Sequence, residues 1–510
     1  MTEAICILGA RIVPIILPEL DPRSTSTTSE QISRFYESAI DDGRVPIGDR
    51  LPPIRVVASR CQVTRATVQD AYRRLADRGL VEGTVGRGTV VLTTTAGGDP
   101  ASNGSARLVS PYAEAALRRT KAMAGAPTLA SEQACVANFA ELQPDDARFP
   151  IPEWRAAMDA VLEHHGRELL GYGHSAMGLD ELRELLARRS EASDPALRGD
   201  QLLVTAGAQQ ALDLILRTVC SIGDTVVVTE PSYHHMHGLL RAHGLQVVQV
   251  PFGPDGLDHA QLTSVLARPS VRLCYLMPTF HNPTGRTLDI AQRRDLIDAV
   301  SSTDVVLVED EYQHSLRCRG EALPTLRSMD PRGRTLTVST VSKELFPALR
   351  IGWIAGDHKL LEPMAAVKRF MDLETSPLLQ AALVEFMKRG SFDRHLQHLR
   401  VELGRRHEAL QLACAEHLPS ECRVTDPEGG FVAWLEMPNE GQGDQLAELA
   451  VERGVRVVPG RAFDLDGSPS RGVRLSLTRA TVEEIHAGVR VLGQCASELL
   501  QLQTAAQPFI

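Results

Sequence analysis

The sequence lacks the cysteine spacing that disulfide frameworks and zinc sites require. Its nine cysteines are scattered over 510 residues, and no two of them stand in a C-x-x-C pair. An odd and dispersed set of cysteines in a chain of this length is typical of reduced thiols in the cytoplasm. We therefore expect a cytoplasmic protein without a metal site.

Long apolar runs and internal repeats are also missing. A membrane helix needs about 20 consecutive apolar residues, and no stretch of the sequence approaches that length. Residues 1–18 are apolar in patches, but Arg11 and Pro14 interrupt them and no small-residue cleavage site follows a basic start. This pattern argues against a signal peptide, and residues 1–28 are predicted to form a disordered extension.

Acidic residues outnumber basic residues over the whole chain, but the charges are unevenly distributed. The net charge is −10, yet residues 30–91 hold ten arginines against eight acidic residues, a surplus of two positive charges. A mildly basic segment on an acidic body permits binding of nucleic acid and limits non-specific adhesion.

Three zones follow one another along the chain. Residues 29–92 form a compact, arginine-rich unit, and residues 93–135 have the Gly, Ala, Ser and Thr content of a flexible linker. From 136 to 500, apolar strand-like runs alternate with helical patterns, and residues from about 375 to 500 are predicted to form a smaller C-terminal α/β subdomain. At 510 residues the chain is too long for one ordinary core.

The alternation of strand-like and helical runs predicts an α/β fold with a mostly parallel central sheet. Several runs are apolar throughout, as strands buried on both faces should be. The predicted strands lie at 201–205, 225–229, 246–250, 271–277, 304–309, 335–339 and 351–355. Ligands of such folds bind at the carboxyl ends of the strands, and polar motifs follow most of these runs.

The arginine-rich unit has the pattern of three helices and a hairpin. Apolar residues between Ile32 and Ile40 predict a first helix, and a second starts after Pro53 and runs to about Arg60. Thr64 is a suitable N-cap for a third helix with an apolar stripe. Two strands around a glycine-rich loop at 83–88 complete a winged helix-turn-helix.

The third helix of this unit is predicted to enter the major groove of DNA. Thr64, Arg65 and Thr67 lie at its N-terminal end, where base edges and phosphates are reached first. Arg55 is placed to contact a phosphate, and Gly86 lets the hairpin loop approach the DNA backbone. A helical protein-interaction domain is the alternative for this unit.

The stretch GRVPIGDRLPPIRVVASRCQVTRATVQDAYRRLADRGLVEGTVGRGTVV closely resembles the GntR family of bacterial regulators. The resemblance implies that Arg55, Thr64, Arg65, Thr67 and Gly86 contact operator DNA. Gln69 stands at a position where the family often has arginine, so the resemblance does not give the operator sequence.

A lysine follows one of the predicted strands within a motif of polar residues. Thr340, Ser342 and Lys343 come directly after the strand 335–339, and Arg350 follows shortly. A single lysine is usually a solvated surface side chain. Here the Thr340 and Ser342 hydroxyl groups and the Arg350 guanidinium can bind a phosphate. The Lys343 amine between them can form a Schiff base.

Other strands end in residues that suit an aromatic, phosphorylated cofactor. Asp310 and Tyr312 follow the strand 304–309, and Asn282 follows the strand 271–277. Tyr233 follows the strand 225–229 and could stack on a ring, although it could equally belong to the core. Asp310 could also be an ordinary helix cap, and Asn282 part of a plain Asn-Pro turn.

Two further features complete the predicted site. Gly207, Ala208 and Gln209 open a helix after a strand, and backbone N–H groups there suit a phosphate. Arg474 stands in an otherwise apolar strand and needs a partner, either a ligand carboxylate or a structural salt bridge.

These residues together match pyridoxal 5′-phosphate (PLP), a cofactor that forms a Schiff base with lysine. Lys343 supplies the amine, Asp310 keeps the pyridine nitrogen protonated, and Tyr312 and Asn282 contact the phenolic oxygen. Thr340, Ser342, Arg350 and the turn at 207–209 are assigned to the phosphate, Tyr233 to the ring and Arg474 to a substrate or effector carboxylate.

From about 138 to about 495 the chain looks like a fold-type I aminotransferase. The matching strings are GYGHSAMGLDELR, VTAGAQQALD, EPSYHHM, HNPTG, VEDEY, SKELFPALRIGW and GVRLSLT, in the family's order. The resemblance implies that Tyr172 reaches the cofactor phosphate of a neighbouring subunit, in a site built at a dimer interface.

A GntR unit joined to an aminotransferase-like body resembles the MocR-type regulators. The resemblance implies a head-to-tail homodimer that binds operator DNA and senses PLP or an amino compound through a Schiff base on Lys343. Many such regulators have an aromatic residue where this chain has Asn282, as transaminases do. An active PLP-dependent transaminase is therefore the alternative, and a DNA-binding protein whose body has lost PLP is a third.

Overall fold

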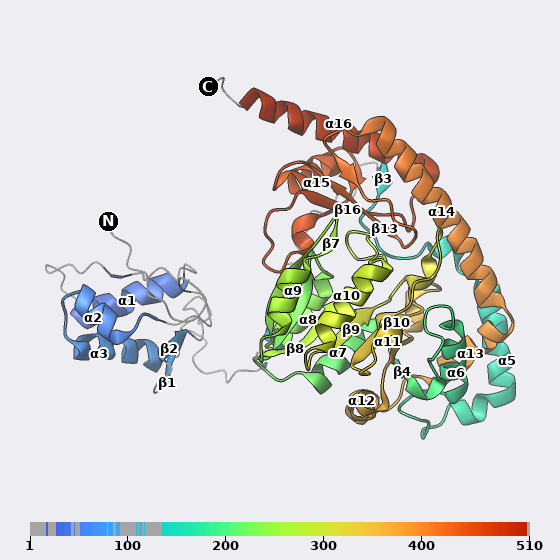
Figure 1. Ribbon diagram of the computed structural model, residues 1–510, viewed down its shortest axis with the longest axis horizontal. Coiled ribbons are helices and arrows are strands. Elements are labelled where there is room, and N and C mark those ends of the chain that lie inside the picture. The colour runs from blue at the N-terminus through green and yellow to red at the C-terminus, as the bar shows by residue number, and fades with distance from the viewer. Residues whose placement is uncertain are drawn as a thin grey trace. The chain divides into compact units, whose positions relative to one another are not determined.

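The chain forms two compact units, residues 1–109 and 110–510 (Figure 1). The structure is a computed structural model. It describes residues 17–18, 27–41, 45, 51–78, 80–84, 88–91, 109–110, 112–114, 117 and 135–506. Most of the predicted extension at 1–28, most of the predicted linker at 93–135, and Gly86 lie outside the described residues.

The N-terminal unit contains three helices followed by an antiparallel hairpin. The elements are α1 (Thr28–Asp41), α2 (Ile54–Arg60), α3 (Arg65–Asp77), β1 (Val81–Thr84) and β2 (Gly88–Val91). The predicted winged helix-turn-helix is confirmed in its element order, and α1 begins four residues before the predicted apolar stripe.

The third helix follows directly from its sequence pattern. The Thr64 hydroxyl accepts a 3.2 Å hydrogen bond from the backbone N–H of Thr67, as an N-cap does. The predicted inner stripe of α3 is buried in the core of the unit, and its members are Val68, Ala71, Tyr72 and Leu75. The Tyr72 hydroxyl donates to the Pro52 carbonyl at 2.7 Å and so ties α3 to the start of α2.

The C-terminal unit is built around an eight-stranded sheet with the order β4-β11-β10-β9-β8-β5-β6-β7. Its strands are β4 (Leu202–Thr205), β5 (Thr225–Glu230), β6 (Gln246–Gly253), β7 (Gly256–Leu257), β8 (Val271–Leu276), β9 (Val306–Asp310), β10 (Thr335–Thr340) and β11 (Gly352–Ala355). All seven predicted strands are present. The mostly parallel sheet is confirmed, with β11 and the short β7 running antiparallel to their neighbours.

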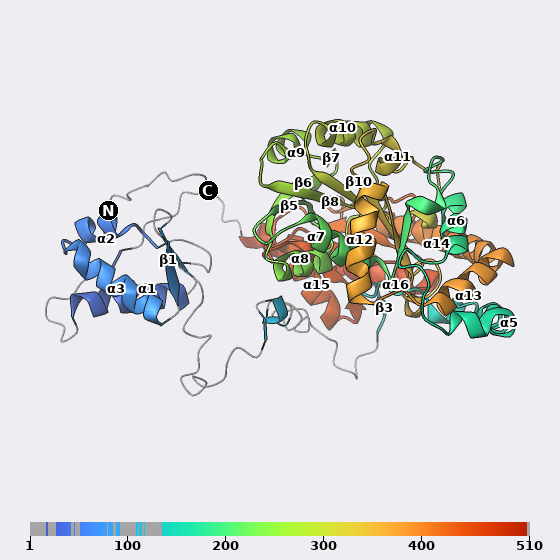
Figure 2. The same ribbon diagram turned by 90° about the horizontal axis from the view of Figure 1, so that it is seen from below.

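Helices cover both faces of this sheet. Figure 2 shows α9 (His259–Leu266), α10 (Ile290–Ser301) and α11 (Leu326–Met329) on one face, and α7 (Ala208–Val219), α8 (His234–Ala242) and α12 (His358–Met371) on the other. Two hydrophobic clusters fill the two layers. Apolar side chains on both faces explain why these strands read as continuous hydrophobic runs.

Side chains at the end of β9 alternate between the two layers. Val306 and Val308 belong to the cluster under α7, α8 and α12, and Leu307 belongs to the cluster under α9, α10 and α11. Since side chains of a strand alternate with a period of two, Asp310 continues the first row. Glu311, the next residue, lies 3.7 Å from Arg293 of α10 and so faces the second layer.

A smaller subdomain follows the large sheet in the chain. Its four-stranded antiparallel sheet has the order β12-β13-β16-β15, and β3 pairs with β14 beside it. The strands are β3 (Ala137–Asn138), β12 (Arg423–Val424), β13 (Val432–Glu436), β14 (Val455–Arg456), β15 (Val458–Pro459) and β16 (Gly472–Ser476). The remaining helices are α5 (Ile151–Leu169), α6 (Asp180–Arg189), α13 (Pro377–Lys388), α14 (Ser391–His417), α15 (Gln442–Glu452) and α16 (Val482–Ala506).

Part of the predicted linker contacts the C-terminal unit. Residues 112–114 are helical, and the Tyr112 ring lies edge-on to His243 with 5.6 Å between the ring centroids. Among the described residues, no helix is both long enough and apolar enough to cross a membrane.

Candidate functional site

Lys343 lies in the loop that follows β10. Its Nζ donates a 2.6 Å hydrogen bond to the Leu142 carbonyl. Burial lowers the pKa of this amine to about 8, and the positive charges of Arg474 and Arg350 act in the same direction. A lysine with a lowered pKa has a larger fraction of its amine neutral, which is the nucleophilic form.

Asp310 ends β9 and is 3% exposed. Its Oδ2 accepts a 2.9 Å hydrogen bond from the Tyr275 hydroxyl, and its Oδ1 is buried without a hydrogen bond to any described residue. Burial raises the pKa of the carboxyl to about 7. A buried carboxylate with one unused oxygen is suited to a positively charged N–H donor.

The turn before α7 requires a glycine at position 207. Gly207 has a φ of +90°, and a Cβ there would lie 2.6 Å from Nη2 of Arg350. That guanidinium nitrogen donates a 2.9 Å hydrogen bond to the Ala206 carbonyl. The N-terminus of α7 and the Arg350 guanidinium therefore meet at one place, where both favour an anion.

The hydroxyl groups near Lys343 differ in their present partners. Oγ1 of Thr340 lies 2.9 Å from both the Ile351 carbonyl oxygen and Oγ of Ser342. The Thr340 hydroxyl is therefore held by Ile351, just before β11, whereas the Ser342 hydroxyl has a hydrogen bond only with Thr340 among the described residues.

Arg474 on β16 is 4% exposed and has an incomplete set of partners. Its Nη2 donates to the Ala140 carbonyl at 2.7 Å and its Nη1 to Oδ1 of Asn282 at 3.4 Å, while Nε has no partner in the described part of the chain. The predicted alternative of a structural salt bridge is not found, since no carboxylate of a described residue lies within 4 Å. Burial lowers the pKa of the guanidinium to about 10.

The two predicted tyrosines of the pocket are both largely enclosed. The Tyr312 hydroxyl accepts a 2.6 Å hydrogen bond from Nε2 of Gln313, and Tyr233 precedes α8 as its N-cap. Burial raises the pKa of both phenols above the usual range, so they stay protonated at neutral pH. Each remains a hydrogen-bond donor.

In the N-terminal unit, four of the predicted DNA contacts lie at the starts of two helices, and Gly86 lies outside the described residues. Arg55 at the start of α2 is exposed, as are Thr64 and Arg65 at the start of α3. The Thr64 and Thr67 hydroxyls lie 2.8 Å apart, so the cap of the helix also orders the side chains that would meet a DNA backbone.

Comparison with known proteins identifies both units. Residues 136–492 match the family model "Aminotransferase class I and II", which covers more than half of the chain. The chain belongs to this family. Residues 28–91 match the model "Bacterial regulatory proteins, gntR family".

Three similar proteins, two aminotransferases and one regulator, show what the chain resembles. Aromatic-amino-acid aminotransferase 1 of Thermococcus litoralis is 31% identical over 70% of this chain and 86% of its own length. The probable rhizopine catabolism regulatory protein MocR of Rhizobium meliloti is 28% identical over 93% of this chain and 94% of its own. The crystal structure of LysN, an α-aminoadipate aminotransferase from Thermus thermophilus complexed with N-(5′-phosphopyridoxyl)-L-leucine, has a TM-score of 0.66 and 28% identity, covering 80% of this chain and 99% of that one.

The chain joins a gntR-family domain to a class I and II aminotransferase domain, which is the architecture of relatives named as MocR and HTH-type regulators. The predicted family and fold class are confirmed. PLP is the cofactor of the aminotransferase fold, so the cofactor prediction is confirmed as well. The gntR-family domain makes DNA the partner of the N-terminal unit.

The residues of this aminotransferase domain fit PLP. A carboxylate oxygen of Asp310 is buried without a donor from the described residues, a glycine turn leaves room that a Cβ would fill, and Lys343 offers a buried amine. Two predicted residues, Gln209 and Tyr172, are exposed, and Tyr172 is 91% exposed. The structure does not enclose either of them in the pocket of its own chain.

Several residues of the pocket were not predicted from the sequence. Tyr275 lies within an apolar strand, where its hydroxyl gives no recognisable signal. The Leu142 and Ala140 carbonyls act through the backbone, which no side-chain motif marks. Phe463, whose ring centroid lies 5.2 Å from the Arg474 guanidinium carbon, resembles any other core aromatic in the sequence.

Proposed function

We propose that this chain regulates transcription by binding operator DNA with residues 28–91 and by sensing PLP, or an amino compound that reacts with it, at Lys343. The observation that carries the sensing role is Arg474, a buried guanidinium with no carboxylate partner among the described residues. It stands in the pocket of Lys343, since it contributes to the lowered pKa of that amine. The N-terminal domain matches a family of bacterial regulators, whose DNA lies in the cytoplasm, and we place this protein there.

PLP, when bound, supplies an aldehyde that bonds to amines and a ring that withdraws electrons. Lys343 attaches the cofactor, and Asp310 holds the protonated ring nitrogen because its unused oxygen is buried. Tyr233 stacks on the ring, and Asn282 and Tyr312 donate to its phenolic oxygen. Arg474 binds the carboxylate of an amino compound.

The N-terminus of α7 binds the cofactor phosphate in this proposal. Backbone N–H groups of Gly207, Ala208 and Gln209 point from the helix end, where the helix dipole favours an anion. Ser342, Thr340 and Arg350 add donors on the other side. Tyr172 reaches the phosphate of a second copy in a head-to-tail homodimer, a role that its exposed position supports.

A mobility shift on DNA from upstream of the chain's own gene tests this proposal. The full chain should retard this DNA, and PLP or an amino acid should change the apparent Kd by a factor of several, because a ligand that prefers one state shifts the equilibrium toward it. In Lys343→Ala the effect of PLP should disappear, while Lys359→Ala, an exposed lysine of α12, serves as the matched control. An unchanged response in Lys343→Ala would contradict the sensing role.

Transamination of an amino acid or amine is the second candidate function. It is favoured by Asn282 before Pro283-Thr284-Gly285 and by a complete set of pocket residues. Lys343 would then move a proton between the substrate carbon and the cofactor, as a general acid and base. Repeated turnover of an amino acid with a keto acid, without retardation of any upstream DNA, would favour the enzyme over the regulator.

A further inference from the structure

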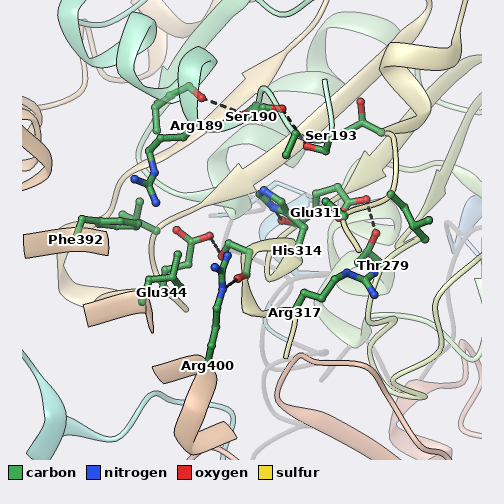
Figure 3. A pocket seen from close by; sticks show the side chains of 18 of the residues that line it. Arg189, Ser190, Ser193, Thr279, Glu311, His314, Arg317, Glu344, Phe392 and Arg400 are labelled. Atoms are coloured by element: carbon green, nitrogen blue, oxygen red, sulfur yellow. Dashed lines mark hydrogen bonds between the residues drawn. The ribbon is translucent and has the colours of Figure 1, made fainter. Parts of the chain in front are cut away.

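A second cavity lies close to the cofactor pocket but is lined by different residues. Its volume is about 350 Å³, and its walls come from α6, α13, α14 and the segment between 311 and 325 (Figure 3). Known small-molecule sites have volumes of about 300–1,000 Å³. The cavity therefore has room for a ligand of amino-acid size.

Two buried carboxylates, those of Glu311 and Glu344, line this cavity. Glu311 is 2% exposed, and its Oε1 accepts a 2.7 Å hydrogen bond from the Thr279 hydroxyl. The Arg293 guanidinium lies 3.7 Å from the same oxygen, which leaves Oε2 buried without a hydrogen bond to any described residue. A buried carboxylate oxygen without a hydrogen bond lowers the stability of the fold, and most buried polar atoms in proteins have a hydrogen-bond partner. Glu344, which is 5% exposed, adds a second carboxylate.

Two arginines, Arg317 and Arg400, also line the cavity. Arg400 is exposed, and its Nε donates a 2.6 Å hydrogen bond to the Ser315 carbonyl; no carboxylate of the described chain lies within 4 Å of its guanidinium. Arg317 pairs with Glu428 through Nη1. Its Nη2 is buried and has no hydrogen-bond partner in the described residues.

Ser315 separates the two charges without neutralising them. Its hydroxyl donates to the Glu344 carboxylate and its carbonyl accepts from Arg400. Glu344 and Arg400 themselves do not form an ion pair. The cavity thus presents two carboxylates and two guanidinium groups, and Figure 3 shows Glu344 beside Arg400. Oε2 of Glu311 and Nη2 of Arg317 have no hydrogen bond to a described residue.

We propose that this cavity is a second small-molecule site, which binds a zwitterion of amino-acid size without a covalent bond to Lys343. The ligand's ammonium group binds Glu311 and Glu344, and its carboxylate binds Arg400 and Arg317. A dicarboxylate would place a negative charge against Glu311, and a diamine would place a positive charge against the arginines. Neither ligand therefore complements both the carboxylates and the arginines of the cavity.

The position of the acidic residues couples this site to the cofactor. Glu311 directly follows Asp310, and Glu344 directly follows Lys343. The backbone N–H of Glu311 donates to the Val338 carbonyl of β10 at 2.8 Å, so the residue after β9 is bonded to the strand that leads to Lys343. If a ligand in the cavity changes the affinity of the protein for PLP by some factor, PLP changes the affinity for that ligand by the same factor.

The test uses the full chain with PLP fixed to Lys343 by borohydride reduction, so that an added amine cannot react there. Each proteinogenic L-amino acid is added in a thermal-unfolding assay, with putrescine and glutarate as probes that carry charge of one sign. We expect at least one amino acid to raise Tm, and titration calorimetry to give its Kd. Putrescine and glutarate should leave Tm unchanged.

Variants locate the binding. Arg400→Met and Glu344→Gln should each weaken the Kd about tenfold, as expected for loss of one hydrogen bond to a charged group. Arg405→Met, an exposed arginine on the same helix α14, should leave the Kd unchanged. The inference is overturned if no amino acid raises Tm, if both cavity variants bind as the parent does, or if putrescine or glutarate binds equally well.

Discussion

The Tyr275 hydroxyl donates a 2.9 Å hydrogen bond to Oδ2 of Asp310. The two residues lie on the neighbouring parallel strands β8 and β9, and both are buried in the layer under α7, α8 and α12. The bond fixes the direction of the carboxyl group, so that Oδ1 is the oxygen left for a ligand.

Asp310→Asn should weaken PLP binding. The amide has the shape of the carboxyl group but no negative charge to pair with a protonated ring nitrogen. The loss of a charge-assisted hydrogen bond, about 1.5–3 kcal/mol, corresponds to roughly a tenfold to hundredfold rise in Kd. Titration of cofactor-free protein with PLP, followed by visible absorbance, measures it, and Asp298→Asn on the exposed side of α10 is the control. Equal affinity in Asp310→Asn and the parent would remove Asp310 from the site.

The rate at which cofactor-free protein captures PLP should depend on pH with a midpoint near 8. Only the neutral amine of Lys343 attacks the aldehyde, and burial lowers the pKa of this amine to about 8. The rate constant should therefore rise as the pH increases through 8 and level off above it, well below the ordinary lysine pKa of about 10.4. Stopped-flow absorbance between about pH 6 and 11, with Nα-acetyl-lysine as the reference for an ordinary ε-amine, shows whether the midpoint is displaced. A midpoint equal to that of Nα-acetyl-lysine would mean that Lys343 is solvated.

Arg474→Lys should reduce the response to amino acids while leaving PLP binding unchanged. A lysine keeps the positive charge but cannot form the bidentate hydrogen bonds that a guanidinium makes to a carboxylate. The concentration of amino acid that gives half of the spectral change of PLP-loaded protein should rise about tenfold, the loss of roughly 1.4 kcal/mol. Arg471→Lys, an exposed position just before β16, is the matched control. If the variant's response to simple amines, which have no carboxylate, fell by the same factor as its response to amino acids, Arg474 would not recognise the carboxylate.

Arg65→Ala should weaken operator binding and leave the PLP spectrum intact. Arg65 is the first residue of α3 and is exposed, and a specific base contact contributes about 1–3 kcal/mol. Footprinting on the upstream DNA measures the change, with Arg73→Ala two turns further along α3 as the control. If Arg65→Ala protected the operator as the parent does, another part of the N-terminal unit would have to read the sequence.

Much of the fold could be predicted because its signals are local. The apolar runs that become β5, β8, β9 and β10 are buried on both faces, and the N-cap at Thr64 follows from one hydroxyl and its place before an apolar stripe. The direction of β11 could not be predicted, since a four-residue run has the same composition whether it is parallel or antiparallel to β10.

The sequence by itself determined the family, the cofactor and the functional residues that follow the strands. Each of these depends on a short contiguous motif whose side chains indicate the chemistry directly. Only the tertiary structure decided which side chains share a pocket. Arg474 and Asn282 are 192 residues apart in the chain and 3.4 Å apart in space, and the unused oxygens of Asp310 and Glu311 face opposite layers although the residues are consecutive. Partners across a sheet depend on strand order and on the alternation of side chains, and neither is encoded in any single stretch of sequence.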